Sequence, residues 1–385
     1  MSSPVPRRKL PVNPSLEHLQ KQAKRRAKQS PSLQLAAAQH AIAQEYGCKN
    51  WAELAHVVET MSRGADQLVG VKKKVEPLPL AARRRDQAEV QRLLESGNYT
   101  PHDLDAALGA AVCYGSAANW DVRKTICDLL ISYGADPDGQ SGSGYGPIVF
   151  GTGECIQPEG LQYLIEAGAD VAFAPVETKY GATCPVSSIL GTYARGANDR
   201  KHCYLDILLA HHPFIPPEVT PPVLAIHRGD AVQLRTCLAR EPELVHRRFA
   251  NLPYGNIELR GATLLHCAVE FGEHDCIEEL VRHGADLDAR AEPSNGIGDQ
   301  TPLFHAIATM SDGNFVTLQF LAHRFGGALD LSLRATFRRL DKIIAPAVTP
   351  LEFAEQVAPE ASDHCRTRVP EELALLREFA ARSGR

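Results

Sequence analysis

Residues 261–290 constrain the fold of this chain more than any other stretch, because they encode two short helices that cannot form a core alone. Thr263 stands where a helix N-cap is expected, an apolar stripe follows it, and Gly272 can end that helix in the left-handed conformation. A second stripe repeats the 3.6-residue period until Gly284 stops it. Two short antiparallel helices leave faces uncovered, so the unit requires neighbours of its own kind.

Related units recur along the chain. Within residues 76–383, Gly-Ala-Asp occurs at 134–136, 168–170 and 284–286, and the first two of these copies are 34 residues apart. The position that follows a helix cap, often proline, marks eight candidate starts at intervals of 30 to 48 residues. These are Pro77, Ala107, Pro147, Pro185, Pro221, Leu264, Pro302 and Pro350. The spacing predicts seven or eight units over residues 76–383, with degenerate units at the amino-terminal end.

The pattern Thr-Leu-Leu-His-Cys-Ala at 263–268, followed by Gly-Ala-Asp at 284–286, resembles the ankyrin repeat, whose signature is Thr-Pro-Leu-His-x-Ala and then Gly-Ala-Asp. Thr301 and Pro302 open a further unit of this kind. The resemblance implies an all-α solenoid of helix-turn-helix units with short finger loops. It also implies that His266 is structural and bonds between turns and repeats. His305 lies one position later in its own unit, so its role stays open.

The sequence divides into four predicted parts. Residues 1–12 form a disordered lead, 13–63 a basic segment of three helices, 64–75 a linker, and 76–385 the solenoid. The helical segment is similar to the extension that precedes the repeats in many uncharacterised bacterial ankyrin proteins, and the resemblance implies no activity for it.

The connectors between repeat units vary in length, and several are rich in Gly, Pro, Asn and Tyr. In the ankyrin arrangement such connectors project from one edge as fingers. Within the last long connector, residues 331–344 have the period of a helix and could form an additional one. A closing amphipathic helix is predicted at 371–382, where it would cap the last repeat.

Composition narrows the location of the protein. No apolar run reaches the ~18 residues of a membrane span, and no hydrophobic region follows the basic residues at the start of the sequence, so we expect neither membrane insertion nor secretion. Ten cysteines occur without any Cys-x-x-Cys pair, and several fall in helical patterns. These features favour a reduced, cytoplasmic protein.

Motifs for chemistry are missing from the sequence. The glycine-rich loop at 139–146 lacks the Gly-Lys-Ser/Thr of a phosphate-binding loop, and no Gly-x-Ser-x-Gly or His-Glu-x-x-His occurs. His202 and Cys203 with His211 and His212 are the densest group of metal-ligand residues, but their spacing fits no structural zinc site. We therefore expect no enzyme activity, no metal and no cofactor. An enzyme with an unrecognised site is the third functional hypothesis.

Charge is distributed unevenly along the chain. Residues 1–75 carry 13 Lys and Arg against 5 Asp and Glu, whereas the remainder carries 28 against 41. Lys21, Lys24, Arg25 and Lys28 share one face of the first helix, which suggests nucleic-acid association as the second hypothesis. The segment has no aromatic platform and the rest of the chain is acidic, so a solvated helix that docks on the solenoid is favoured.

The leading hypothesis is a non-catalytic scaffold that binds an unidentified protein, and we expect a monomer. Three connectors place Tyr before Gly just ahead of a repeat, at Tyr145, Tyr180 and Tyr254. Tyrosine is enriched among binding hot spots, so these rings are predicted to contact the partner, with Glu270 and Phe271 lining the adjoining groove. The alternative is that each ring folds back on its own repeat.

Overall fold

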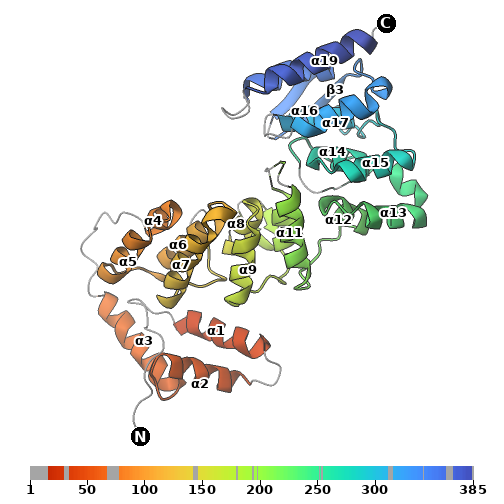
Figure 1. Cartoon of the computed structure of the whole chain (residues 1–385). Coiled ribbons are helices and arrows are strands. Elements are labelled where there is room, and N and C mark those ends of the chain that lie inside the picture. The colour runs from red at the N-terminus through yellow and green to blue at the C-terminus, as the bar shows by residue number, and fades with distance from the viewer. Residues whose placement is uncertain are drawn as a thin grey trace. The chain divides into compact units, whose positions relative to one another are not determined.

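Sixteen α-helices follow one another as eight pairs in the described part of residues 78–383 (Figure 1). The computed structural model describes residues 16–29, 34–66, 78–141, 146–178, 181–192, 195–196, 198–250, 252, 255–310, 315–340, 342–360 and 367–383. The first helices of the pairs are α4 (Leu78–Arg84), α6 (Pro101–Cys113), α8 (Ile148–Glu154), α10 (Pro185–Leu190), α12 (Pro221–His227), α14 (Leu264–Phe271), α16 (Pro302–Met310) and α18 (Pro350–Val357). The second helices are α5 (Gln87–Ser96), α7 (Trp120–Ser132), α9 (Pro158–Glu166), α11 (Asn198–Leu209), α13 (Ala231–Arg240), α15 (His274–Arg282), α17 (Phe315–Phe325) and α19 (Val369–Ser383). The all-α helix-turn-helix architecture predicted from the sequence is confirmed.

Seven of the eight first helices begin at the predicted proline position or at the residue after it, and one does not. Helix α6 begins at Pro101, six residues before the predicted start at Ala107. The reason is a capping box, in which Thr100 Oγ1 accepts the Asp103 amide at 3.2 Å and the Asp103 carboxylate accepts the Thr100 amide at 2.9 Å. Ala107 therefore lies in the middle of a helix of 13 residues.

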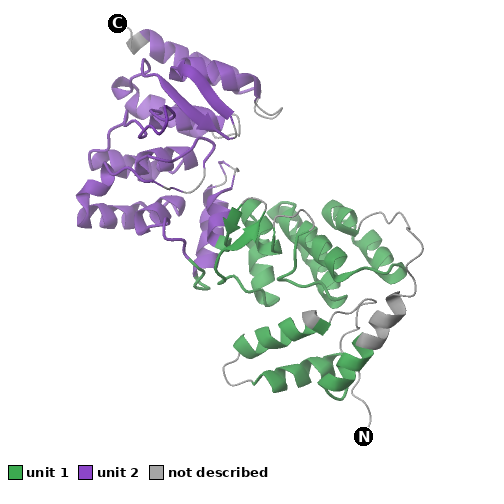
Figure 2. Cartoon of the chain, turned by 180° about the vertical axis from the view of Figure 1, so that it is seen from behind, with its two compact units in different colours: residues 1–185, 210–214 green, residues 186–209, 215–385 purple. Residues whose placement is uncertain are grey.

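The chain forms two compact units (Figure 2). Unit 1 comprises residues 1–185 and 210–214, and unit 2 comprises residues 186–209 and 215–385. Within unit 1, first helices α4, α6 and α8 pack in that order, and second helix α5 packs beside α7. Within unit 2, α12, α14, α16 and α18 stack in the same way, with α13 beside α15 and α17 beside α19.

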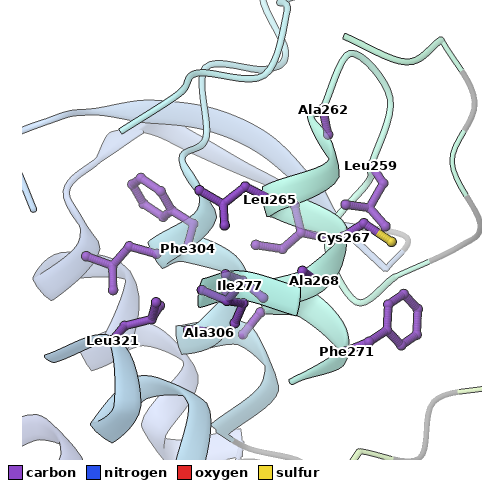
Figure 3. Close-up of a cluster of buried hydrophobic side chains, with 14 of the residues drawn as sticks. Leu259, Ala262, Leu265, Cys267, Ala268, Phe271, Ile277, Phe304, Ala306 and Leu321 are labelled. Atoms are coloured by element: carbon purple, nitrogen blue, oxygen red, sulfur yellow. The ribbon is translucent and has the colours of Figure 1, made fainter. Parts of the chain in front are cut away.

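Unit 2 buries its apolar side chains between successive pairs. Figure 3 shows Leu265 and Ala268 of α14 together with Phe304 and Ala306 of α16 in one cluster. Gly272, with φ of 69°, ends α14 in the left-handed region, which lets α15 turn back at once. Each pair therefore completes the core of the next.

The amino-terminal helices form a small core of their own within unit 1. They are α1 (Leu16–Gln29), α2 (Leu35–Glu45) and α3 (Trp51–Asp66), the three helices predicted for this segment. Helix α3 extends three residues past the predicted boundary at 63, and the remainder of the predicted linker lies outside the described residues, as does the lead at 1–12. The core side chains are Leu19, Ala23, Ala38, Ile42, Ala43, Cys48, Leu54 and Val58.

Two short hairpins occupy connectors between pairs. One joins β1 (Val176–Thr178) to β2 (Gly181–Thr183), and the other joins β3 (Ala335–Arg339) to β4 (Lys342–Val348), both antiparallel. The additional helix considered for residues 331–344 is therefore wrong. Alternate residues of β3 are buried, and Phe337 packs its ring 5.2 Å from that of Phe304, so period-two burial outweighs the helical pattern.

Aspartates link the turns of successive repeats. Asp105 accepts the backbone N–H of Asp136 at 2.7 Å, and Asp138 accepts that of Asp170 at 2.8 Å. Asp288 accepts that of Asp330 at 3.1 Å in unit 2. We call this series the aspartate ladder. It joins Asp105 of α6 to the turn at Asp136, the turn at Asp138 to that at Asp170, and the turn at Asp288 to that at Asp330.

Among the described residues, none of the helices combines the length and the apolar character needed to cross a membrane.

Candidate functional site

A groove of about 540 Å³ runs over the first helices α4, α6 and α8 of unit 1. Small residues open it, because Ala106, Gly109 and Ala110 fall at i, i+3 and i+4 on one face of α6. Gly151 of α8 lies so close to α6 that a Cβ there would be 2.6 Å from the Cys113 sulfur. We call this site the inner-helix groove. Its lining also includes Pro79, Leu80, Arg83, His102, Asp103, Tyr114, Ser141, Glu154 and Cys155.

Exposed polar and aromatic groups also line this groove. Tyr114 is 37% exposed, and the Arg83 guanidinium lies 4.3 Å from its ring centroid. Partial burial raises the pKa of the Tyr114 hydroxyl, so the phenol stays neutral and can donate a hydrogen bond. An aromatic ring beside apolar small residues is suited to a partner side chain that is apolar at its body and polar at its tip.

The basic helix α1 lies against acidic turns in the same unit. Arg25 pairs with Asp136 at 3.1 Å and also with Asp138, and Lys28 pairs with Asp170 at 3.1 Å. We call Asp136, Asp138 and Asp170 the acidic turn row. Of the four cations predicted as nucleic-acid contacts, Arg25 and Lys28 thus face carboxylates, and Lys21 and Lys24 line the groove beside them.

Carboxylates of these turns titrate unusually. Burial raises the pKa of Asp138 to about 6, against the lowering effect of Arg25. For Asp170, burial alone would raise the pKa, but the Ala172 amide and the Lys28 ammonium bring it below its usual value. Asp138 and Asp170 are therefore ionised near neutral pH and attract cations.

In unit 2 the structure places Glu270 inside the protein. The residue is 0% exposed, and its carboxylate lies 2.7 Å from Arg195 Nη2 and 2.8 Å from His305 Nδ1. It also accepts the Asn256 amide at 2.6 Å. Burial alone raises the pKa of Glu270, but Arg195 and His305 hold it below its usual value. The groove-lining role predicted for Glu270 is corrected: its carboxylate compensates buried cations.

Phe271 is also buried, with 2% exposure. The Arg195 guanidinium lies 4.4 Å from its ring centroid, and the Lys201 ammonium lies 4.2 Å from it. Burial lowers the pKa of Lys201 to about 8, although Glu273 opposes this shift from 3.7 Å. Lys201 is only 3% exposed, so its ammonium group is not accessible to solvent. The ring is therefore a core element between two cations and not the lining of a groove.

His266 joins two repeats. Its Nδ1 lies 2.9 Å from Thr263 Oγ1 and accepts the Thr263 backbone N–H at 3.1 Å, so the proton resides on Nε2. Nε2 then donates to the carbonyl of Gln300 at 3.0 Å, which precedes Thr301 and Pro302 at the start of α16. Burial lowers the pKa of His266 to about 3, so the ring stays neutral. Gly284, with φ of 90°, follows α15 in the left-handed region.

The predicted tyrosine contacts and the predicted group of metal-ligand residues remain to be located. Tyr145, Tyr180 and Tyr254 lie outside the described residues. His202 contacts the Glu273 carboxylate at 3.0 Å, whereas His211 lines the groove beside α1 in unit 1. In the part of the chain that the structure describes, three or more His, Cys, Asp or Glu side chains nowhere converge as a metal site would require.

These helix pairs, linked by turn aspartates and by a buried Thr–His bond, define a helical repeat protein built from helix-turn-helix units. Residues 260–292 match the family model of the ankyrin repeat. The chain therefore contains an ankyrin repeat at residues 260–292. No curated protein matches it.

Two ankyrin repeat domains are among the solved structures that are similar to this chain. The ankyrin repeat domain of human ASB11 is 18% identical, with 60% of this chain and 90% of that one covered, at a TM-score of 0.35. The ankyrin repeat domain of Bcl-3, a member of the IkappaB family, is 15% identical, with 80% of this chain and 100% of that one covered, at a TM-score of 0.27.

Proposed function

We propose that the protein is a non-catalytic scaffold that holds a protein partner in the inner-helix groove of unit 1. The observation that carries the proposal is the groove itself, which small residues of α6 and α8 open and which Tyr114 and Arg83 line. Ankyrin repeats generally act as protein-binding modules. Exposed aromatic and arginine side chains around an apolar surface are the usual anchors of such binding.

The predicted finger contacts are a separate part of the proposal. Tyr145 and Tyr180 belong to connectors of unit 1, and Tyr254 belongs to a connector of unit 2. Tyrosine loses little conformational entropy when a partner orders it, which supports a second set of contacts from these loops. We keep the hypothesis that these three tyrosines contact the partner. Glu270 and Phe271 are no longer part of it, because both are buried.

The cysteines favour a reducing compartment for this protein. All nine cysteines that the structure describes are free thiols, and most are buried within helices. We therefore place the binding reaction in the cytoplasm.

The test is affinity capture with a variant that blocks the groove. Ala106→Arg places a long side chain on the open face of α6, where arginine is a good helix former. We expect the variant to lose the proteins that the wild type captures reproducibly from nuclease-treated extract of its host. Ala88→Arg, on the exposed face of α5, is the matched control and should retain them.

Thermal unfolding of both variants should stay within a few degrees of the wild type, because neither position is fully buried. A second arm replaces Tyr145, Tyr180 and Tyr254 by Ala. If Ala106→Arg captures the same proteins as the wild type, the groove is not the binding surface. If only the triple variant loses them, the fingers alone bind the partner.

A further inference from the structure

The acidic turn row of unit 1 carries a second inference, because a helix of the same chain is seated on it. Arg25 and Lys28 are three positions apart on α1, so they project from one face of the helix about one turn apart. Their partners, Asp138 and Asp170, come from successive repeats of unit 1. One face of a basic helix therefore spans two neighbouring turns.

Ion pairs and not apolar packing hold α1 on the row. Leu19 and Ala23 of α1 are buried in the core that α1 forms with α2 and α3. On the other side, a groove of about 800 Å³ separates α1 from the repeats, and its lining includes Ile165 and Val171. Helix α1 thus keeps its own core whether or not it contacts the row.

The ion pairs are partly open to solvent. The side chain of Arg25 is 13% exposed, and that of Lys28 is 73% exposed. The Lys28–Asp170 pair is exposed, weak and screened by salt, and α1 keeps its own core when it leaves the row, so the contact is reversible. A surface held by reversible ion pairs is available to a competitor that carries the same charges.

We propose that the acidic turn row is a docking surface for a basic helix of a partner protein, and that α1 occupies it in cis until such a helix displaces α1. The inference deepens the proposed binding function by adding a surface and the chemistry of its partner, and it does not involve the inner-helix groove. The partner helix would present two cations at i and i+3 toward successive turns.

Variants can remove the charges without disturbing the turns. Oδ1 of Asp138 accepts the Asp170 amide, and Oδ1 of Asp170 accepts the Ala172 amide at 2.9 Å, whereas the second oxygen of each faces the cation. Asn retains an amide oxygen that can occupy the Oδ1 position. Asp138→Asn with Asp170→Asn therefore preserves the backbone bonds and removes two of the three carboxylates of the row.

The experiment measures binding of a fluorescent peptide with the sequence of residues 16–29 to the full chain, by anisotropy. The apparent dissociation constant rises as α1 occupies the row, because only the open fraction binds. The chain with Arg25→Gln and Lys28→Gln should therefore bind the peptide at least about fivefold more tightly than the wild type. Adding Asp138→Asn and Asp170→Asn to that chain should remove the gain, and raising the salt concentration should weaken binding.

Three results would overturn the proposal. They are equal affinity of the wild type and the Gln variant, binding that persists in the Asn variants, and no binding to any form. A peptide with Gln at the same two positions is the matched control and should not bind. Ala106→Arg should leave peptide binding unchanged, so failure of this proposal is distinguishable from failure of the inner-helix groove.

Discussion

At the scale of single residues, the burial of Glu270 could not be predicted from the sequence. Glutamate is normally a surface residue, so its position near the end of a repeat helix suggested contact with a partner. The structure buries it because Arg195 lies 75 positions earlier and His305 lies 35 positions later in the sequence, and all three meet in unit 2. Such a pairing depends on how the connectors fold, which periodicity does not report.

Glu270→Ala should destabilise unit 2 by about 3–5 kcal/mol, because it leaves the buried Arg195 charge without its carboxylate. Urea unfolding followed by far-ultraviolet circular dichroism measures the change in the free energy of unfolding. Glu355→Ala is the control, since Glu355 pairs with Arg377 at 2.7 Å on the surface and its loss should cost at most about 1 kcal/mol. Similar costs for the two variants would contradict the buried pairing.

His266 should make stability depend on acid. Its pKa is about 3 in the folded protein and ordinarily 6.5, so between these values the unfolded state binds a proton that the folded state does not. Above pH 6.5 His266 is neutral in both states and adds no acid destabilisation. Below pH 6.5 its protonation in the unfolded state lowers the free energy of unfolding by about 1.4 kcal/mol for each pH unit. Denaturant unfolding of the wild type and of His266→Gln from neutral pH to pH 4 tests this.

The difference in unfolding free energy between these two proteins should shrink as the pH falls, because only the wild type carries the acid-sensitive ring. Carboxylates titrate equally in both, so they cancel in the comparison. Parallel curves would show that His266 does not titrate as its burial requires.

At the scale of elements, the sequence predicted helices better than connectors. Apolar period and cap residues located most helix starts, since these signals are local. The start of α6 differs from the predicted one because the capping box of Thr100 and Asp103 begins the helix at Pro101, outside the interval pattern of the other repeats. The β3–β4 hairpin was missed because a short apolar segment can match both periods, and its burial against Phe304 and Phe353 decides between them.

Leu280→Ala tests the coupling of repeat units. Leu280 is 0% exposed in α15, which packs beside α13 and α14, so the substitution should cost about 2–5 kcal/mol. Because repeats interact with nearest neighbours, amide hydrogen exchange should increase most within residues 220–310. Uniform loss of protection from α1 to α19 would instead indicate a single cooperative core.

At the scale of the whole molecule, charge argues against nucleic acid. The formal net charge is −5, and two of the cations on α1 face the acidic turn row. Each phosphate contact would add roughly 0.9 log units of salt dependence. We expect no measurable binding of a short labelled DNA duplex at ~0.15 M salt, where exposed charges are screened beyond ~8 Å.

Fluorescence anisotropy measures this binding. Submicromolar affinity at that salt concentration, lost when Lys21, Lys24, Arg25 and Lys28 are all changed to Glu, would favour the nucleic-acid hypothesis over the scaffold.

The aspartate ladder also has a consequence for how this chain can diverge. The same hydrogen bond spans 31 residues from Asp105 to Asp136, 32 from Asp138 to Asp170, and 42 from Asp288 to Asp330. The register between neighbouring repeats therefore does not depend on the number of residues between the bonded groups. The stretch of chain between two repeats can therefore differ in length by about ten residues while one aspartate hydrogen bond still joins them.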